Sequence, residues 1–363
     1  MPIGNVAQVL RLVRSNIRGL KPYVGGAQII SYAEWAKLNQ NESPYPPPPS
    51  VRAVGNKFNE PGFLNRYPPG DHKELKGRLA AHLGLAPEQI TFGNGSDEVL
   101  QNVALVFLDK GDKLAYMKPD YSMWPVYEQL TGASPRIIDL PDDYTLPVDR
   151  VSAERPKLVF FSNPHTPSGT LTPIDDVRRL CEELFPNIIV EDEAYADFAE
   201  GNSLKLLEDC PNLIVTKTFS KAFALAGMRL GYGLGHPSVI SQIDAIRLPY
   251  NINAATYAVG LAALEPESIE YYDGMIRLIK SERNRLRDSL ENVGFSVRPS
   301  HANFVLAKTE SPEMAEMLYH GLAKNNILIR YFSDERLVDC IRITVGTPEE
   351  NDHLIAEIGE LLG

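Results

Sequence analysis

Short apolar runs alternate with helical patterns between about residues 72 and 235, and this alternation restricts the possible folds strongly. The runs are only four to five residues long, and strands of that kind are typically buried on both faces. Helical segments between such strands connect parallel neighbours. The pattern predicts an α/β fold with a mostly parallel sheet flanked by helices, with strands at Gln89–Gly93, Lys113–Tyr116, Pro135–Ile138, Lys157–Phe161, Asn187–Val190, Asn212–Thr216 and Leu230–Leu234.

The segments on either side of this sheet predict a smaller second body. Residues 1–20 have apolar side chains at helical spacing, and Pro44–Pro49 is stiff and extended because proline cannot continue a helix. A long helical segment over residues 256–291 is followed by an α+β pattern, with strands at Phe295–Val297, Ala302–Ala307, Ile327–Arg330 and Cys340–Val345 and helices over 312–325 and 348–361. The expected division is an N-terminal helix and arm packing with the small domain (1–45), a large domain (46–255) and a small α+β domain (256–363).

Composition excludes several classes of partner. Of 363 residues, 44% are apolar, which suffices for a sizeable core, and the net charge of −11 disfavours binding to nucleic acid or anionic membranes. No window approaches the roughly 18 apolar residues that cross a bilayer, and the basic N-terminus lacks the apolar segment of a secretory signal. Cys181, Cys210 and Cys340 are odd in number and far apart, so they predict neither a disulfide framework nor a metal site. We expect a cytoplasmic protein.

The stretch Val215–Arg229 places a lysine where its amine becomes a nucleophile. Lys221 lies among aromatic and aliphatic residues, and apolar surroundings lower the pKa of a lysine because they disfavour its charged form. The hydroxyls of Thr218 and Ser220 and the guanidinium of Arg229 are groups that bind phosphate. An amine beside a phosphate site suits a Schiff base with pyridoxal phosphate, although a lone lysine is more often a surface residue.

The segment Gly93–Glu98 follows a predicted strand and begins a helix. Gly95 precedes Ser96 and Asp97, so backbone N–H groups at the start of the helix can face an anion. The alternative is an ordinary helix start that is capped by the Ser96 side chain. Because open α/β sheets bind ligands beyond the carboxyl ends of their strands, the segment is a candidate phosphate site.

Three further segments carry side chains that suit a flat, charged ligand. Asp192 ends a predicted strand and would pair with a protonated ring nitrogen, and Tyr195 would hydrogen-bond a phenolic oxygen. The segment Pro119–Trp124 supplies an aromatic ring that suits stacking, and Arg342 between two isoleucines suits bidentate binding of a carboxylate. Each has a structural alternative, namely a loop acid or metal ligand, a core aromatic residue and an exposed strand arginine.

In this order the segments resemble the fold-type I pyridoxal-phosphate aminotransferases, and within them the histidinol-phosphate aminotransferase group. The resemblance extends over nearly the whole chain, and eight ordered motifs are very unlikely to coincide by chance. The motifs are Leu38–Pro44, Asn65–Gly70, Gly93–Glu98, Pro119–Tyr121, Asn163–Gly169, Asp192–Tyr195, Thr218–Arg229 and Ile341–Gly346, with Leu20–Tyr23 and Ile327–Arg330 as extensions.

The resemblance implies which residues hold the cofactor, pyridoxal 5'-phosphate. Lys221 is implied as the Schiff-base lysine that moves the α-proton, with Asp192 at the pyridine nitrogen and Tyr195 at the phenolic oxygen. Tyr121 would stack on the ring. The implied phosphate-binding residues are Gly95, Ser96, Asp97, Thr218, Ser220 and Arg229.

The resemblance also implies partners. Tyr67 would reach the phosphate of the partner subunit's cofactor, which implies a homodimer. The substrates would be an amino donor and a 2-oxo acid, with histidinol phosphate or an aromatic amino acid on one side and glutamate or 2-oxoglutarate on the other. The implied substrate-binding residues are Arg342, Arg330, Tyr23, Asn41 and Tyr250.

The chain departs from the family pattern at the pocket. Thr166 replaces the asparagine that normally donates to the phenolic oxygen, and Asp120 replaces a usual threonine or serine. Trp124 stands where tyrosine is common. His165 offers an extra acid/base group beside Thr166, or a structural hydrogen bond in the loop.

These departures leave alternatives to transamination. Changed residues at positions 166 and 120 would permit a pyridoxal-phosphate-dependent decarboxylase or other α-carbon chemistry on a related amino acid. A non-catalytic cofactor-binding module is a third hypothesis, but such proteins usually carry a DNA-binding domain, and about 35 residues precede the first motif.

Overall fold

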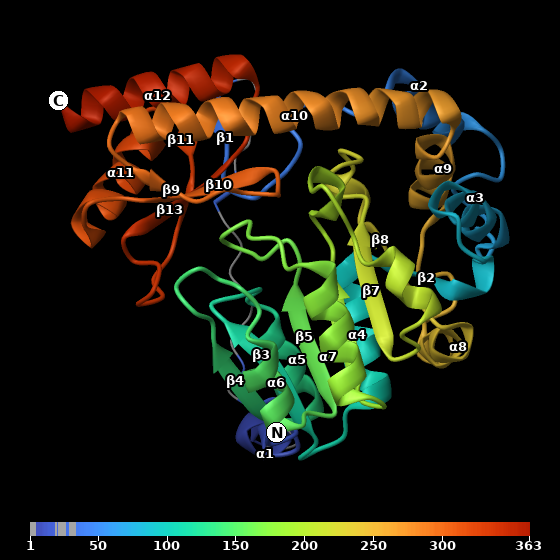
Figure 1. Cartoon of the computed structure of the whole chain (residues 1–363). Coiled ribbons are helices and arrows are strands. Elements are labelled where there is room, and N and C mark those ends of the chain that lie inside the picture. Colours follow the sequence, from blue (N-terminus) through green and yellow to red (C-terminus); the bar gives the residue numbers. More distant parts are fainter. Residues whose placement is uncertain (1–4, 19, 21–26, 29–33) are drawn as a thin grey trace.

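The structure contains a seven-stranded sheet and a separate four-stranded sheet, each packed with its own helices (Figure 1). This computed structural model describes residues 5–18, 20, 27–28 and 34–363. The long helix α10 (Pro266–Asn292) runs along the top of Figure 1 from the larger body to the smaller one. The α/β fold class expected from the sequence is confirmed.

The large sheet has the order β2-β8-β7-β6-β5-β3-β4. Strands β7, β6, β5, β3 and β4 pair in parallel, whereas β8 is antiparallel to both of its neighbours. The carboxyl ends of the parallel strands therefore meet at one edge, where such sheets bind ligands. The strands are β2 (Ile90–Asn94), β3 (Lys113–Lys118), β4 (Ser134–Asp139), β5 (Leu158–Ser162), β6 (Ile188–Asp192), β7 (Leu213–Thr218) and β8 (Leu230–Gly235).

Both faces of the large sheet are buried because successive residues of a strand point to opposite sides. On β5, Phe160 packs in one hydrophobic cluster and Phe161 in the other. Helices α4 (Ser96–Phe107), α5 (Trp124–Thr131) and α8 (Pro237–Ile246) contribute to the first cluster, and α6 (Val148–Glu154) and α7 (Ile174–Leu184) to the second. A hydrophobic core on each face of the large sheet thus explains why its strands are apolar at successive positions.

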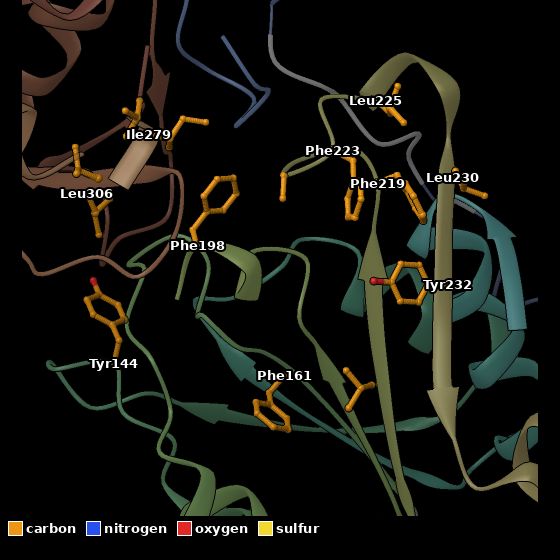
Figure 2. Close-up of a cluster of buried hydrophobic side chains, with 14 of the residues drawn as sticks. Tyr144, Phe161, Phe198, Phe219, Phe223, Leu225, Leu230, Tyr232, Ile279 and Leu306 are labelled. Carbon is orange, nitrogen blue, oxygen red and sulfur yellow. The ribbon is translucent and has the colours of Figure 1, made fainter. Parts of the chain in front are cut away.

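The second cluster extends to the segment that follows β7 (Figure 2). Phe219 and Phe223 are buried there with ring centroids 4.4 Å apart, and Phe219 meets Tyr232 edge-on at 5.6 Å. These rings anchor the backbone on both sides of position 221. Helices α2 (Pro49–Arg52), α3 (Lys73–Leu83) and α9 (Ala254–Ala263) pack beside this part of the molecule.

The smaller body is built on the antiparallel sheet β12-β13-β10-β9, with α11 (Pro312–Lys324) and α12 (Pro348–Leu362). A short parallel pair joins the N-terminal arm to this body, because β1 (Ala36–Lys37) pairs with β11 (Ile327–Leu328). The remaining strands are β9 (Ser296–Val297), β10 (Phe304–Lys308), β12 (Arg330–Tyr331) and β13 (Cys340–Thr344).

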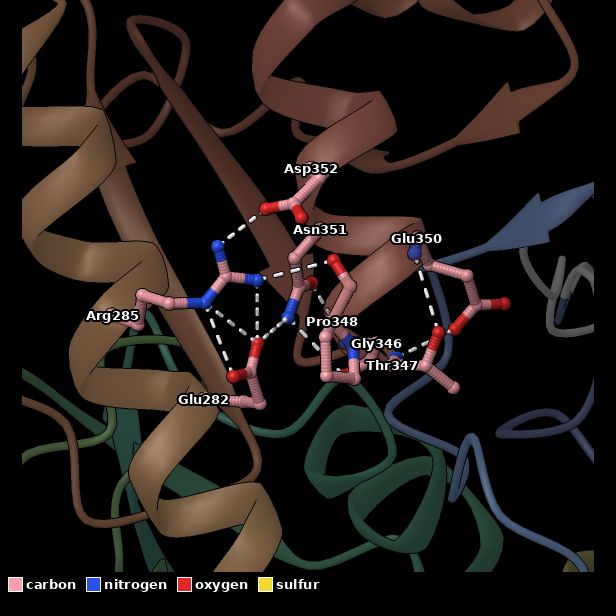
Figure 3. A network of polar contacts seen from close by, with 8 residues as sticks. All are labelled: Glu282, Arg285, Gly346, Thr347, Pro348, Glu350, Asn351 and Asp352. Carbon is pink, nitrogen blue, oxygen red and sulfur yellow. Dashed lines mark hydrogen bonds and ion pairs between the residues drawn. The ribbon is translucent and has the colours of Figure 1, made fainter.

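A polar network fixes the end of β13 against α10 and α12 (Figure 3). Asn351 accepts the N–H of Gly346 at 3.0 Å and donates to Glu282 at 3.0 Å, and Glu282 also binds Arg285. Thr347 and the residue three positions later form a capping box that starts α12. The network holds the strand that carries Arg342.

Two sequence expectations about helices are corrected. The N-terminal helix α1 covers only Val6–Leu10, and the turn after it contacts the larger body through Asn16, which donates to the Gln129 carbonyl of α5. The helical segment after residue 253 is two helices, α9 and α10, because Pro266 begins a new one. Among the described residues, no helix combines the length and the apolar character needed to cross a membrane.

Candidate active site

A cavity of about 1080 Å³ lies where the carboxyl ends of the large sheet's strands face the smaller body. Its wall includes most of the residues selected from the sequence, although these come from segments up to 300 residues apart. Selected residues that line it are Asn41, Ser96, Asp97, Tyr121, Thr166, Asp192, Tyr195, Thr218, Ser220, Lys221, Arg229, Arg330 and Arg342.

Lys221 projects into this cavity from the turn after β7. Its Nζ donates to the carbonyl oxygen of Gln40 at 2.9 Å and lies 5.7 Å from the centre of the Tyr195 ring. Burial, followed by the positive charge of Arg342, lowers the pKa of Lys221 to about 8. The lowered pKa increases the share of neutral amine, which is the form that can attack a carbonyl.

Asp192 ends β6 on the floor of the cavity. Its carboxylate accepts a hydrogen bond from the Thr216 hydroxyl at 2.8 Å and is 6% exposed. Burial raises the pKa of Asp192 to about 7, and the nearby negative charge of Asp97 adds to the shift. A buried carboxylate of this kind is stabilised by a cation, so it suits a ligand that presents a protonated ring nitrogen.

Tyr195 is held by a residue of the N-terminal arm. Asn41 donates from Nδ2 to the Tyr195 hydroxyl at 3.0 Å, and its own backbone carbonyl accepts from Asn303 at 3.0 Å. Asn41 has a φ of 56°, a left-handed conformation that asparagine tolerates better than most residues. The arm is thus part of the site, and Asn41 contacts the phenol that was expected to face the ligand.

An anion cradle lies at the start of α4. Gly95 precedes the helix with a φ of 84° and provides no side-chain cap, so the first backbone N–H groups remain available to a ligand. The hydroxyls of Thr218 and Ser220 lie 2.9 Å apart, and Arg229 donates to Ser220 at 3.3 Å. Arg229 also pairs with Asp97 at 3.3 Å. Together these donors match a phosphate dianion.

Gly231 keeps this cradle open, which leads to a prediction. A Cβ at position 231 would overlap the backbone nitrogen of Ser96. We expect Gly231→Ala to displace the helix start, to lower the free energy of unfolding by about 1–3 kcal/mol and to weaken phosphate binding. Chemical denaturation and phosphate-ester titration measure both. The control Gly201→Ala has open space and should change neither, and wild-type behaviour of Gly231→Ala would contradict the cradle.

Tyr121 forms one side wall of the cavity. Its hydroxyl donates to Asp97 at 2.7 Å, and its ring packs edge-on against Trp124 at 5.2 Å. Trp124 itself is fully buried and stacks on Phe160 at 4.8 Å. Trp124 therefore supports Tyr121 from the core, while only the Tyr121 ring lines the cavity.

Arg342 reaches the cavity from β13. Its guanidinium donates to the Thr166 hydroxyl at 3.4 Å and to the Asn39 carbonyl at 3.2 Å. It lies 5.2 Å from the centre of the Phe304 ring and 5.8 Å from that of Phe332, and such contacts orient a guanidinium. The sequence alternative of an exposed edge arginine is wrong, because Arg342 faces an interior cavity.

Two selected tyrosines lie outside the cavity of their own chain. Tyr67 is 79% exposed, and its ring stacks at 4.4 Å on that of Tyr250, which is 44% exposed. Tyr250 does not line the cavity of its own chain, and its role in substrate binding stays a prediction. Tyr23 lies outside the described residues.

Sequence reasoning missed several supporting residues. Gln40 binds Lys221 through its backbone, and a backbone contact leaves no signature in the side-chain pattern. Glu42 lines the cavity and favours the charged form of Lys221. Thr216 lay two positions before Thr218, so the period-two rule for strands was a usable signal that it faces the same side.

Comparison with known proteins places the chain in a family. The family model described as "Aminotransferase class I and II" matches residues 33–358. The histidinol-phosphate aminotransferase 1 of Trichormus variabilis is 37% identical over 96% of this chain and 98% of that protein, and the Geobacter sulfurreducens histidinol-phosphate aminotransferase is 36% identical over 96% and 99%.

Solved structures agree with this assignment. A Sinorhizobium meliloti histidinol-phosphate aminotransferase, solved in complex with pyridoxal-5'-phosphate, superposes with a TM-score of 0.87 at 28% identity, covering 96% of both chains. A mutant Thermus thermophilus aspartate aminotransferase shares the fold with a TM-score of 0.80 at 20% identity, covering 97% of this chain and 99% of that chain. These relatives do not favour decarboxylation or a non-catalytic module. The resemblance inferred from the motifs is confirmed, and the chain belongs to the class I and II aminotransferases.

Proposed function

We propose that the protein transfers an amino group between histidinol phosphate and 2-oxoglutarate with pyridoxal 5'-phosphate as cofactor. One observation carries the proposal: an amine of lowered pKa, a buried carboxylate and an anion cradle line the same cavity. An aromatic amino acid is the alternative donor. Relatives named histidinol-phosphate aminotransferase support the first donor.

The residues present fit pyridoxal phosphate. The donors at the start of α4, with Thr218, Ser220 and Arg229, would hold the phosphate, and Asp192 would pair with the ring nitrogen. Tyr195 and Thr166 would lie toward the phenolic oxygen, and Tyr121 would pack on the ring face. When bound, the cofactor supplies a carbonyl for an amine and a cationic ring that withdraws electrons from the adjacent carbon.

Lys221 is proposed as the acid/base of the reaction. Its neutral amine accepts a proton, and the resulting ammonium can return that proton at a different atom. The Gln40 carbonyl, 2.9 Å from Nζ, keeps the amine directed along the cavity wall. The carboxylate of Asp192 would keep the ring nitrogen of the bound cofactor protonated, because a nearby negative charge favours the charged form of a base.

Arg342 and Arg330 are proposed to bind the anionic groups of the substrates. Both guanidiniums line the cavity, and Arg342 is placed between two aromatic rings. A phosphate on the amine donor and a carboxylate on the 2-oxo acid would alternate at this end of the site. Arg342 suits bidentate binding of either anion.

A direct assay tests the proposed function. Purified protein with pyridoxal phosphate is incubated with histidinol phosphate and 2-oxoglutarate, and glutamate formation is followed. Parallel reactions use phenylalanine, and evolved CO₂ is measured in each. Glutamate from histidinol phosphate without CO₂ is expected. Preference for phenylalanine would reassign the donor, and CO₂ without glutamate would refute transamination.

Separate substitutions of the two arginines make a further prediction. Arg342→Gln should raise KM for 2-oxoglutarate at least about 30-fold, because the hydrogen-bonded charge pair between the guanidinium and the substrate carboxylate is lost. Arg330→Gln should raise KM for the phosphorylated donor more than KM for 2-oxoglutarate. Steady-state kinetics in both substrates measure this, and Arg287→Gln, on α10 and absent from the cavity wall, serves as control. Unchanged KM values in Arg342→Gln would remove Arg342 from the site.

We propose that the active protein is a homodimer, in which Tyr67 reaches the partner subunit's site. The exposed ring of Tyr67 and the exposed apolar residues Leu64 and Leu248 support this, because a free subunit would leave them in water. Light scattering tests the assembly. We also keep a cytoplasmic location as a proposal, supported by three cysteines that are all free thiols.

A further inference from the structure

The two departures from the family pattern, Asp120 and Thr166, belong to one chain of hydrogen bonds. Asp120 follows β3 and Thr166 follows β5, which pair in parallel. The Ser162 hydroxyl donates to Asp120 Oδ1 at 2.5 Å and accepts the backbone N–H of Thr166 at 2.9 Å. Ser162 thus joins the carboxylate to the turn that carries Thr166.

Asp120 is a fixed acceptor in this chain. Besides the Ser162 hydroxyl, it accepts the backbone N–H of Tyr121 at 2.6 Å and that of Ser162 at 3.3 Å. A serine or threonine at position 120 carries one hydroxyl oxygen, closer to the backbone, instead of two carboxylate oxygens. It cannot accept all three of these hydrogen bonds. The carboxylate therefore sets where Ser162, and the turn beyond it, is held.

Thr166 connects this turn to Arg342 through a hydrogen bond. Its hydroxyl oxygen accepts from Arg342 at 3.4 Å, which leaves the hydroxyl hydrogen free to donate into the cavity. An asparagine would use two separate atoms for these tasks and would extend one bond further from the backbone. A threonine serves both only if its turn lies at the matching distance from Arg342.

His165 holds the same turn at a second point. Its Nε2 lies 2.8 Å from the Pro119 carbonyl, and its Nδ1 lies 2.7 Å from the Ser168 hydroxyl. A carbonyl only accepts, so Nε2 carries the hydrogen, and burial lowers the pKa of His165 to about 4, which keeps the ring neutral. The structural alternative for His165 fits this geometry. The turn is therefore tied to the Pro119–Tyr121 segment twice.

We propose that Asp120 and Thr166 are a matched pair, in which Asp120 acts through Ser162 to hold the threonine where its hydroxyl positions Arg342 for the substrate anion. Asp120 is a positioning residue, and the inference rests on the proposed transamination. Its consequence is that each residue depends on the other. The pair commonly found in the family, asparagine with threonine, should function as a unit, whereas mixed pairs should not.

A double-mutant cycle tests the pairing. Thr166→Asn, Asp120→Thr and the double variant are compared with wild type in KM and kcat, and in the pH titration of the visible absorption of cofactor-bound protein without substrate. Each single variant should raise KM for 2-oxoglutarate about tenfold or more and shift the titration, and the double should recover most of both losses. Losses in the double that equal the product of the single losses would overturn the pairing.

Two more variants separate positioning from general damage. Asp120→Asn keeps the size and one oxygen that can accept from the Ser162 hydroxyl, but its amide nitrogen cannot accept the Ser162 N–H, so it should raise KM less than Asp120→Thr does. Ser162→Ala removes the hydroxyl that joins Asp120 to Thr166, so it should raise KM as much as Asp120→Thr does. Adding Ser162→Ala to the Asp120→Thr variant should raise KM no further. If Ser162→Ala raised KM by its full factor in the Asp120→Thr variant as well, the proposed connection through Ser162 would be wrong. Thermal unfolding of each variant verifies folding.

The readouts also separate this inference from the proposed function. If wild type transfers no amino group from any donor tested, the proposed transamination is wrong. The absorption titration of wild type and the three variants then still decides whether positions 120 and 166 are coupled. If wild type is active and the cycle is additive in both readouts, only the pairing fails.

Discussion

Replacing Lys221 by alanine is expected to reduce kcat for transamination by at least about 10³-fold, because the variant lacks the group that accepts and returns the proton. The donors for phosphate and Asp192 remain in place, so cofactor should still bind, with an altered visible absorption. Stopped-assay kinetics and an absorption titration with pyridoxal phosphate measure the two effects separately.

Two control variants define what Lys221 contributes. Lys221→Arg keeps a positive charge, but a guanidinium does not lose its proton in a protein, so this variant should be as inactive as alanine. Lys205→Ala, at an exposed lysine, should retain full activity. Activity of Lys221→Ala near the wild-type level would refute both the role of Lys221 and the proposed function.

The second large effect is expected in stability, at Lys217. This lysine lies on β7 beneath the site with 3% of its side chain exposed, and its Nζ pairs with Asp197 at 2.8 Å and with Glu193 at 3.3 Å. Burial would lower the pKa of Lys217, but the charges of Asp197 and Glu193 raise it above the usual value. Lys217→Met leaves Glu193 as a buried unpaired acid and should lower the free energy of unfolding by about 3–5 kcal/mol.

The penalty at Lys217 should depend on pH. Burial raises the pKa of Glu193 already in the wild type, and loss of the ammonium raises it further. A raised carboxyl pKa in the folded state costs stability above the unfolded pKa and costs less as the pH falls toward it. Denaturation at pH 5 and pH 8, at fixed protein concentration, should therefore give the larger penalty at pH 8.

An exposed ion pair provides the control for Lys217. Lys157 pairs with Asp112 at 2.6 Å with 47% of its side chain exposed, so Lys157→Met should change the free energy of unfolding by no more than about 1 kcal/mol. Equal effects at positions 217 and 157 would mean that the buried network does not stabilise the fold. A penalty that grows toward pH 5 would contradict the assignment to Glu193.

Most strands of both bodies were predictable because their signals are local. The expected strand Ile327–Arg330 is wrong, because β11 and β12 pair in two different sheets there. A strand that is buried on both faces is apolar throughout, so it stands out in the sequence. The expected strand Lys157–Phe161, for example, differs from the observed β5 (Leu158–Ser162) by a single residue at each end. The break between α9 and α10 was missed because helical spacing continues across it, and only Pro266 marks the new start. The N-terminal helix was overestimated, since apolar spacing alone does not supply a surface to pack against.

The residues of the candidate site were predictable where a motif carries its own chemistry. Lys221, Asp192 and Arg229 were named from their neighbours in the sequence, and all three line one cavity in the structure. Their partners were not predictable in the same way. Gln40 contacts Lys221 from 181 positions away through a backbone carbonyl, and any side chain at position 40 would leave that carbonyl in place.

The sequence by itself determined the fold class, the family and the chemical types of the candidate site residues, because each strand pattern and each motif is a local signal that can be read without knowing where the chain folds. Only the tertiary structure decided which groups share an environment. Burial across the β6–β7 pair raises the pKa of Asp192, and the approach of β13 brings Arg342 to Thr166 across 176 positions. Desolvation and Coulomb interactions depend on distance in space, and spatial distance follows from packing rather than from position in the sequence.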